Sequence, residues 1–271
     1  MDTHLVLRRD DSRLTTRGWN SYPSDTSDHR AFRYLTPKKR LEASDLIATG
    51  LVRARCVHLI CSPARAAGLR NELIEAGAVR QIAVWEPVPD LCTPEHREKM
   101  LRTVGMMEVV SPNAEELAGF WADEELPEGE WERMETLAAR VSEAGAGTVV
   151  VRAGKLGCLV VGKDGAVRLP AYYDEVGERN HTKVVDPTGG GNAFVGGLGI
   201  GMARGMDMVE AAAMGTVAAS FAIEQIGMPV LTQGVDGEEL WNGVRVSDRL
   251  EEYRRRLQAL GVGSHNRANS Q

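Results

Sequence analysis

Three consecutive glycines, Gly189 to Gly191, constrain this chain more than any other stretch. Two β-branched residues, an acid and a Pro-Thr step precede them, and an apolar segment rich in glycine and alanine follows. This order predicts a strand at 184–185, a turn, and a helix that opens near Asn192. Glycines leave backbone N–H groups uncovered, and a helix start adds unpaired donors and partial positive charge. The sequence therefore predicts a site for a phosphate or a phosphoryl group in transfer.

The same stretch resembles the C-terminal signature of the ribokinase-like (PfkB) small-molecule kinases, Asp-Thr-x-Gly-Ala-Gly-Asp. This chain has Asp-Pro-Thr-Gly-Gly-Gly-Asn, so Asp186 and Asn192 keep the spacing of the two family acids. The final Asp is the catalytic base of the family, and this chain has an asparagine there, which indicates a divergent branch. The alternative is a flexible glycine-rich loop between a strand and a helix. We favour the anion site because acid, glycines and helix are in register.

Composition excludes several classes of function. The chain has 271 residues, 43% of them hydrophobic and 26% charged, which is typical of one large globular α/β domain. A net charge of -6 argues against a nucleic-acid partner, and no stretch approaches the roughly eighteen apolar residues of a membrane span. The four cysteines show neither a Cys-x-x-Cys pair nor a zinc spacing. We expect a cytosolic or nuclear protein, with the cytoplasm as the default, and no nucleic-acid or membrane partner.

Short apolar runs alternate with amphipathic segments from residue 56 onward. The expected strands are 56–60, 81–85, 107–110, 148–152, 158–161 and 167–173, and the expected helices are 63–76, 94–104, 131–144 and 208–226. Such alternation implies parallel strands with helices on both faces, joined by right-handed crossovers. We therefore predict a three-layer, doubly wound α/β fold with a mostly parallel sheet, as the resemblance to ribokinase-like proteins also implies.

We divide the chain into a partial lid and substrate-contact segment at 1–45, an α/β domain at 46–250 and a solvated helical tail at 251–271. Residues 15–22 suit contacts to a polar ligand, or equally a solvated β-ribbon. In the resembled family this region supplies a β-lid, a Gly-Gly sugar contact and the first strand. No Gly-Gly pair precedes residue 189, so we expect a shortened N-terminal strand and lid. An unpaired sheet edge would follow, and with it a homodimer or poor solubility.

Asn113 and Glu116 follow the expected strand 107–110 and lie three residues apart on the first turn of a helix. They match the family's Asn-x-x-Glu motif, and the resemblance implies that they hold magnesium and its waters near the phosphates. A capping box has the same local pattern and is the alternative.

Arg152, Gly154 and Gly157 match the family's Thr-x-Gly-x-x-Gly motif, except that arginine replaces threonine. The resemblance implies that this loop touches the nucleotide phosphates. Arg152 could pair with phosphate or could block the older geometry. Two residues of the preceding strands are also polar: we expect His58 to be a hydrogen-bonded core histidine rather than a catalytic one, and Glu86 to be a substrate contact or part of a plain turn.

The resemblance covers roughly residues 50–230 and implies an ATP-dependent kinase for a hydroxyl of a sugar, nucleoside or related small metabolite. It gives Asp186 a role in the cation site, makes Gly189, Gly190 and Gly191 the anion hole, and implies ATP and Mg²⁺, with K⁺ as a further candidate. The alternatives are a non-catalytic nucleotide- or metabolite-binding protein, favoured by Asn192, Arg152 and the absent Gly-Gly contact, and an enzyme with different chemistry on this fold.

Overall fold

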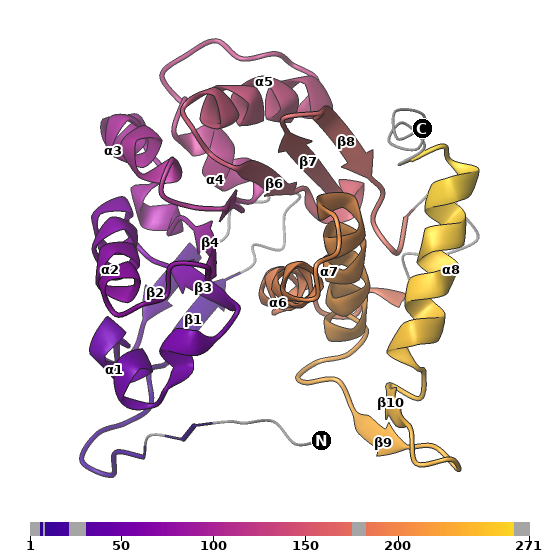
Figure 1. The fold of residues 1–271 in the computed structure, drawn as a ribbon. Coiled ribbons are helices and arrows are strands. Elements are labelled where there is room, and N and C mark those ends of the chain that lie inside the picture. Colours follow the sequence, from indigo (N-terminus) through magenta and orange to yellow (C-terminus); the bar gives the residue numbers. More distant parts are fainter. Residues whose placement is uncertain (1–5, 8, 22–30, 175–182, 263–271) are drawn as a thin grey trace.

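The centre of the molecule is a six-stranded sheet in the order β3-β4-β5-β6-β7-β8 (Figure 1). The computed structural model describes residues 6–7, 9–21, 31–174 and 183–262. The first four strands run parallel, and the last two are joined to them antiparallel. The strands are β3 (Cys56–Ile60), β4 (Ile82–Glu86), β5 (Val109–Val110), β6 (Thr148–Arg152), β7 (Cys158–Gly162) and β8 (Gly165–Leu169).

Helices cover both faces of the sheet, so the predicted three-layer α/β architecture is confirmed. One core lies between the sheet and α2, α3 and α5, and a second lies between the sheet and α6, α7 and α8. No helix of the described residues is long and apolar enough to cross a membrane. The helices are α1 (Ala43–Ala48), α2 (Pro63–Glu75), α3 (Pro94–Val104), α4 (Ala114–Gly119), α5 (Glu130–Glu143), α6 (Gly190–Ala203), α7 (Met208–Ala222) and α8 (Val246–Ala259).

The apolar run of β6 shows why the middle strands lack a polar face. Val149 and Val151 belong to the core under α5, whereas Val150 points into the opposite core. All three are fully buried, because side chains alternate across a strand that is covered on both sides. This burial fixes the register of the central strands.

Small residues bring α6 and α7 into direct backbone contact. A Cβ added at Gly197 would lie 2.7 Å from the Met214 carbonyl oxygen, and one added at Gly215 would lie 2.7 Å from the Phe194 carbonyl oxygen. Any larger side chain would push the helices apart. Not every glycine of α6 serves this contact, because Gly196 faces open space.

Two sequence-based expectations about the ends of these elements are wrong. No strand forms at 184–185; instead the N–H groups of Val185 and Asp186 both donate to the Ile223 carbonyl oxygen at the end of α7. Two β-branched residues are too weak a signal for a strand when no neighbouring strand edge is there to pair with them. The tail from 251 is also not simply solvated, because α8 runs through residue 250 and buries Tyr253 and Leu257 against the core.

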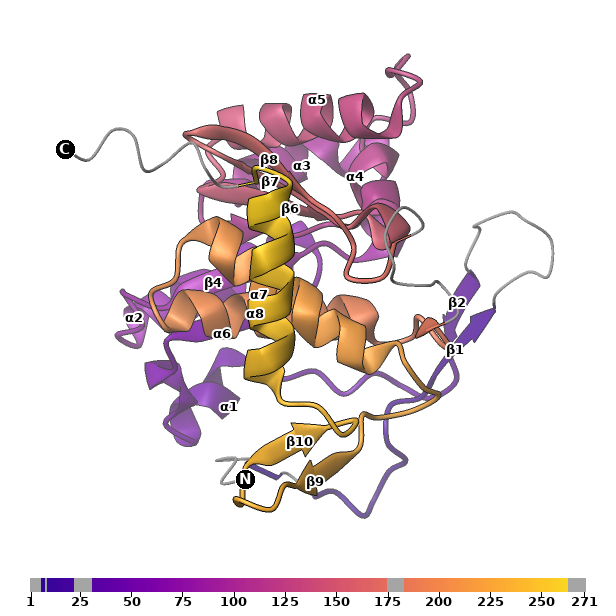
Figure 2. The same cartoon turned by 90° about the vertical axis from the view of Figure 1, so that its right-hand side faces the viewer.

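Two hairpins lie outside the main sheet. β1 (Gly18–Ser21) pairs antiparallel with β2 (Ala31–Tyr34), which gives the expected segment the form of a β-ribbon. Figure 2 shows this ribbon standing apart from the six-stranded sheet. β9 (Leu231–Gln233) and β10 (Glu239–Trp241) form the second, which was not predicted. Within the described residues β3 and β8 are the edge strands of the main sheet, and pairing of two copies at the β3 edge stays a prediction.

Substitutions in α8 test whether it belongs to the core. Tyr253→Ala should lower the free energy of unfolding by about 3 kcal/mol, because it empties a buried aromatic site. Tyr253→Phe should lower it by about 1 kcal/mol, because the hydroxyl donates to the Pro170 carbonyl oxygen. The exposed Arg255→Ala is the control and should change stability by less than about 0.5 kcal/mol in urea unfolding. Equal, small effects for all three would mean that α8 is a solvated tail.

Candidate active site

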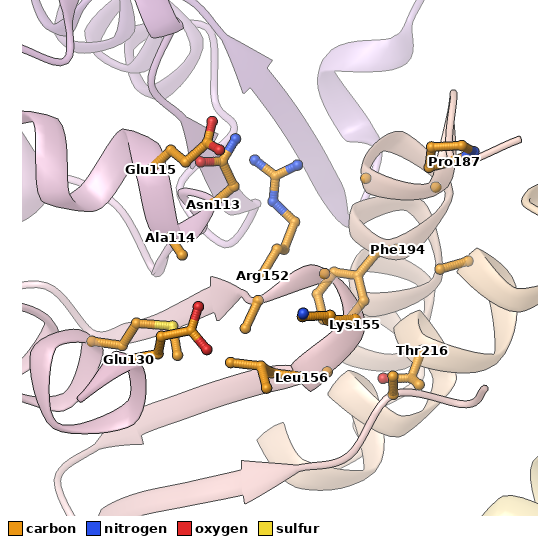
Figure 3. Close-up of a pocket in the computed structure, with 18 of the residues that line it drawn as sticks. Asn113, Ala114, Glu115, Glu130, Arg152, Lys155, Leu156, Pro187, Phe194 and Thr216 are labelled. Carbon is orange, nitrogen blue, oxygen red and sulfur yellow. The ribbon is translucent and has the colours of Figure 1, made fainter. Parts of the chain in front are cut away.

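A cavity of about 650 Å³ opens at the carboxyl end of β6, between α4 and α5 on one side and α6 and α7 on the other (Figure 3). This is the edge at which doubly wound sheets bind ligands. Its lining includes six residues that the sequence analysis assigned to a site: Asn113, Arg152, Gly154, Gly157, Gly190 and Gly191. Gly189, Asn192, Asp186 and Glu116 belong to the same turns but do not line it.

The glycine turn forms the N-terminus of α6. Gly189 is the N-cap, with a φ of 87° that favours glycine, and open space lies beyond its Cα. Gly190 donates to the Pro187 carbonyl oxygen, but the N–H groups of Gly191 and Asn192 bond to no described residue. The first turn of α6 therefore presents unpaired donors, as the anion-site hypothesis requires.

Asp186 shapes the entry to that turn. Its Oδ1 accepts the Thr188 N–H at 2.9 Å, and this backbone bond is the main reason why the pKa of Asp186 lies below its usual value. The carboxylate is partly exposed and stays ionised at neutral pH. Asn192 lies one turn further on, in the first turn of α6, with an exposed side chain.

Arg152 is the main charged group of the cavity. Its Nη2 donates to Glu86 Oε1 at 2.8 Å, to Glu116 Oε2 at 3.2 Å and to the Ser111 carbonyl oxygen at 3.2 Å. Nε is buried without a hydrogen-bond partner among the described residues. Nη1 lies beside the glycine turn, since a Cβ added at Gly191 would come within 2.5 Å of it. Figure 3 shows the side chain between Asn113 and the helix that carries Phe194.

Asn113 and Glu116 form the capping box that was the alternative to a metal motif. Glu116 Oε2 accepts the Asn113 N–H at 2.8 Å, and Asn113 Oδ1 accepts the Glu116 N–H at 2.7 Å. Burial raises the pKa of Glu116 to about 7, although the Arg152 charge opposes this shift.

A capping box does not exclude a cation. No described residue donates to Glu116 Oε1, which leaves one carboxylate oxygen for a metal ion or its water. The described residues contain no group of three His, Cys, Asp or Glu side chains that could hold a metal by themselves. Magnesium bound to phosphates needs only one or two protein carboxylates, so Glu116 with Asn113 fits such an ion.

Sequence reasoning underestimated Glu86. This residue ends β4, is buried, and accepts from His58 Nε2 at 3.0 Å as well as from Arg152. Burial would raise the pKa of Glu86, but the bonds and charges of His58 and Arg152 outweigh it and lower that pKa. The expectation of a hydrogen-bonded His58 is confirmed, whereas the plain turn at Glu86 is wrong.

The two glycines after β6 have different roles. Gly157 has a φ of 103°, and an added Cβ would lie 2.0 Å from the Leu169 carbonyl oxygen, so this glycine is required by the backbone packing. Gly154 has a φ of 55° and open space beyond it, facing the cavity. Gly154 is thus the one free to meet a ligand. Tyr172, Ala219 and Ser220 also line the cavity.

A three-layer α/β fold with a glycine turn at a helix start, at the carboxyl edge of its sheet, is an architecture shared by several classes of phosphate- and nucleotide-binding proteins. The model of the pfkB family of carbohydrate kinases matches residues 28–230 of this chain. The chain therefore belongs to the pfkB carbohydrate kinase family.

Curated relatives are found in fungi and beyond. An uncharacterized protein of Schizosaccharomyces pombe is 34% identical over 269 residues, covering 93% of this chain and 73% of the relative. Protein MAK32 of Saccharomyces cerevisiae is 32% identical and covers 93% of this chain and 72% of its own length. Inositol 3-kinase of Arabidopsis thaliana is 33% identical over 118 residues, which are 44% of this chain and 29% of that enzyme.

Solved structures support the fold. Arabidopsis thaliana ribokinase complexed with ribose and ATP superposes with a TM-score of 0.60 at 17% identity, covering 87% of this chain and 69% of the ribokinase. The nucleoside kinase of Methanocaldococcus jannaschii gives a TM-score of 0.55 at 18% identity, covering 88% of this chain and 68% of the nucleoside kinase. At this level of identity the likeness shows a ribokinase-like architecture and no more.

Alanine substitutions at two glycines of α6 test the close contact with Arg152. Gly196→Ala should stabilise the protein by about 0.5–1 kcal/mol, because the site is open and alanine favours a helix. Gly191→Ala should bring no such gain, because the new Cβ displaces a guanidinium that two carboxylates hold. Guanidinium chloride unfolding of both variants measures the difference. An equal gain at both positions would show that Arg152 does not lie against this turn.

The raised pKa of Glu116 predicts a pH dependence of stability. The folded-state pKa of Glu116, about 7, exceeds the ordinary value of 4.5. Protonated Glu116 therefore contributes stability to the fold that is fully present below pH 4.5 and is lost as the pH rises through 7. Between these values the free energy of unfolding should fall by about 3 kcal/mol more in the wild type than in Glu116→Gln. The substituted side chain keeps an oxygen for the Asn113 N–H. Parallel pH profiles for the two proteins would contradict the shift.

Proposed function

We propose that this protein binds a nucleoside triphosphate, ATP by resemblance, and transfers its terminal phosphoryl group slowly to a hydroxyl of a sugar, nucleoside or related small metabolite. The observation that carries this proposal is the convergence of unpaired donors on one end of the cavity. The Nη1 of Arg152 lies beside Gly191, whose N–H is unpaired among the described residues, and the unpaired Asn192 N–H follows in the same helical turn. Kinases of inositol and cytidine among the relatives support a small hydroxyl acceptor.

Phosphoryl transfer depends chiefly on positioning and on stabilising negative charge, and this chain keeps both. The start of α6 would orient the phosphates through its N–H groups and partial positive charge. Arg152 would add a fixed positive charge beside them. Gly154 would let the backbone after β6 approach the phosphates closely, because it has no side chain.

A cation fits the remaining groups. Glu116 and Asn113 would hold Mg²⁺ or its waters at the cavity wall, with Asp186 assigned to the cation site from the glycine side. When bound, magnesium supplies charge neutralisation for the phosphate oxygens. A K⁺ ion near Asp186 belongs to the same proposal.

Asn192 lacks the carboxylate that would serve as the catalytic base at this position. An amide does not take up the acceptor's proton at neutral pH, and loss of a general base typically slows a reaction by ~10²–10⁴-fold. Neither Gly191 nor Arg152 can replace a base, because both only donate. We therefore expect slow turnover with nucleotide binding intact.

A non-catalytic nucleotide-binding protein is the second candidate. The exposed, uncharged Asn192 and the ion pairs that hold Arg152 favour it, because they leave a binding site without a proton acceptor. In that case the protein would bind a nucleotide or metabolite in a cytoplasmic assembly and transfer nothing.

Asn192→Asp separates the two candidates. In an attenuated kinase the new carboxylate supplies a base, so kcat should rise by up to ~10²–10⁴-fold on one acceptor. ADP release from a panel of sugars, inositols and nucleosides measures this gain, with the wild type alongside. Asn192→Ser is the matched control, because it changes the side chain without adding a base.

The non-catalytic candidate predicts a different outcome. A carboxylate near the terminal phosphate should then weaken nucleotide binding by about 1 kcal/mol and bring no turnover. Calorimetry with a non-hydrolysable ATP analogue and Mg²⁺ measures this on the same proteins. If the folded wild type gives no binding heat at millimolar analogue, the nucleotide site itself is wrong.

A further inference from the structure

We propose that Glu86, supported by His58, is a positioning residue that fixes the Arg152 guanidinium for the phosphate chain of the nucleotide. This inference rests on the proposed function and adds two residues from strands β3 and β4 to a site otherwise built from β6, α4 and α6. Its basis is a continuous chain of side chains, from His58 to Glu86 to Arg152, that ends at the glycine turn.

Each oxygen of Glu86 has its own partner. Oε2 accepts from His58 Nε2 at 3.0 Å, and Oε1 accepts from Arg152 Nη2 at 2.8 Å. The carboxylate lies at the end of β4, so it spans β5 to reach the end of β6. Held from both sides, it has little freedom to rotate, and the arginine that it binds is fixed with it.

The remaining hydrogens of Arg152 face the cavity end of α6. Nη2 meets three oxygens, whereas no described residue accepts from Nη1 or Nε. The buried Nε has given up water without gaining a partner, which is costly, and Nη1 keeps free hydrogens beside the glycine turn. An anionic ligand at the start of α6 would satisfy them. Glu116 alone could not fix the direction of the guanidinium, because its Oε2 is shared with the Asn113 N–H.

A purely structural ion pair is the competing explanation, and this chain contains a matched example. Arg70 is buried and donates from Nη2 to Glu108 Oε1 at 2.7 Å, while Glu108 Oε2 accepts the Ala83 N–H. Arg70 also has a buried Nε without a partner, but neither residue lines the cavity. Glu108 itself is 43% exposed, so Glu108→Gln is the control for breaking the ion pair of a buried arginine far from the ligand.

The experiment compares two ligands on three proteins. Calorimetry measures the binding of a non-hydrolysable ATP analogue, and of adenosine, to the wild type, Glu86→Gln and Glu108→Gln. Glu86→Gln should weaken the analogue about tenfold, the size of one charge-assisted contact, and leave adenosine within about twofold. Glu108→Gln should lower Tm but change neither affinity, because its arginine does not face the phosphates.

A double-mutant cycle with Arg152→Lys shows whether Glu86 acts through the arginine. Once lysine replaces the fork-shaped guanidinium, adding Glu86→Gln should cause less than about twofold further loss. If Glu86→Gln does not fold, His58→Phe tests the same chain and should weaken the analogue about threefold, since it frees one side of the carboxylate.

Three results would overturn the inference. Unchanged analogue affinity in Glu86→Gln would reject the positioning role while the nucleotide site stands. Equal losses for analogue and adenosine, together with a lower Tm, would make the ion pair structural. Absence of binding to the folded wild type would reject the proposed function as well.

Discussion

The backbone contact between α6 and α7 determines where the candidate site lies. Gly197 and Gly215 remove the side chains that would separate the two helices, and the loop before α6 is then tied to the end of α7 through the Ile223 carbonyl oxygen. With the helix body held against the sheet, the first turn of α6 has one available direction, toward the carboxyl end of β6. The direction of the N–H donors in the glycine turn is thus set by the α6–α7 contact at Gly197, which lies up to two helical turns further along α6.

Positive potential in this cavity comes from two kinds of group. At the glycine turn positive potential comes from backbone groups that need no counterion. At the end of β6 it comes from Arg152, which is neutralised by Glu86 and shares Glu116. Two carboxylates around one guanidinium leave excess negative charge in a buried place. Burial is the main cause of the raised pKa of Glu116, and the Glu86 charge adds to it while Arg152 opposes it. A bound cation or a proton on Glu116 would each restore the balance.

Local patterns predicted the strands and helices well, but not the contacts between them. The valine run of β6 and the proline that opens α3 are signals that need no partner. The burial of α8 could have been predicted from Leu250, Tyr253 and Leu257, which recur at helical spacing. The pairing of Glu86 with Arg152 joins residues 66 positions apart, so no spacing rule reaches it. The only hint was that both are polar residues at the carboxyl ends of apolar runs.

The asparagine at 192 separates two properties that a carboxylate would combine. An aspartate there would accept the acceptor's proton, but it would also repel a triphosphate held by Gly191 and Arg152. The neutral amide of asparagine neither accepts the proton nor repels the triphosphate. Asparagine in place of aspartate would therefore lower turnover and favour nucleotide binding. The donors around the turn act on the bound phosphates in both cases, because they are backbone and guanidinium N–H groups that do not titrate at neutral pH. Under the proposed function, a chain with this site would therefore hold a nucleotide more readily than it would consume it.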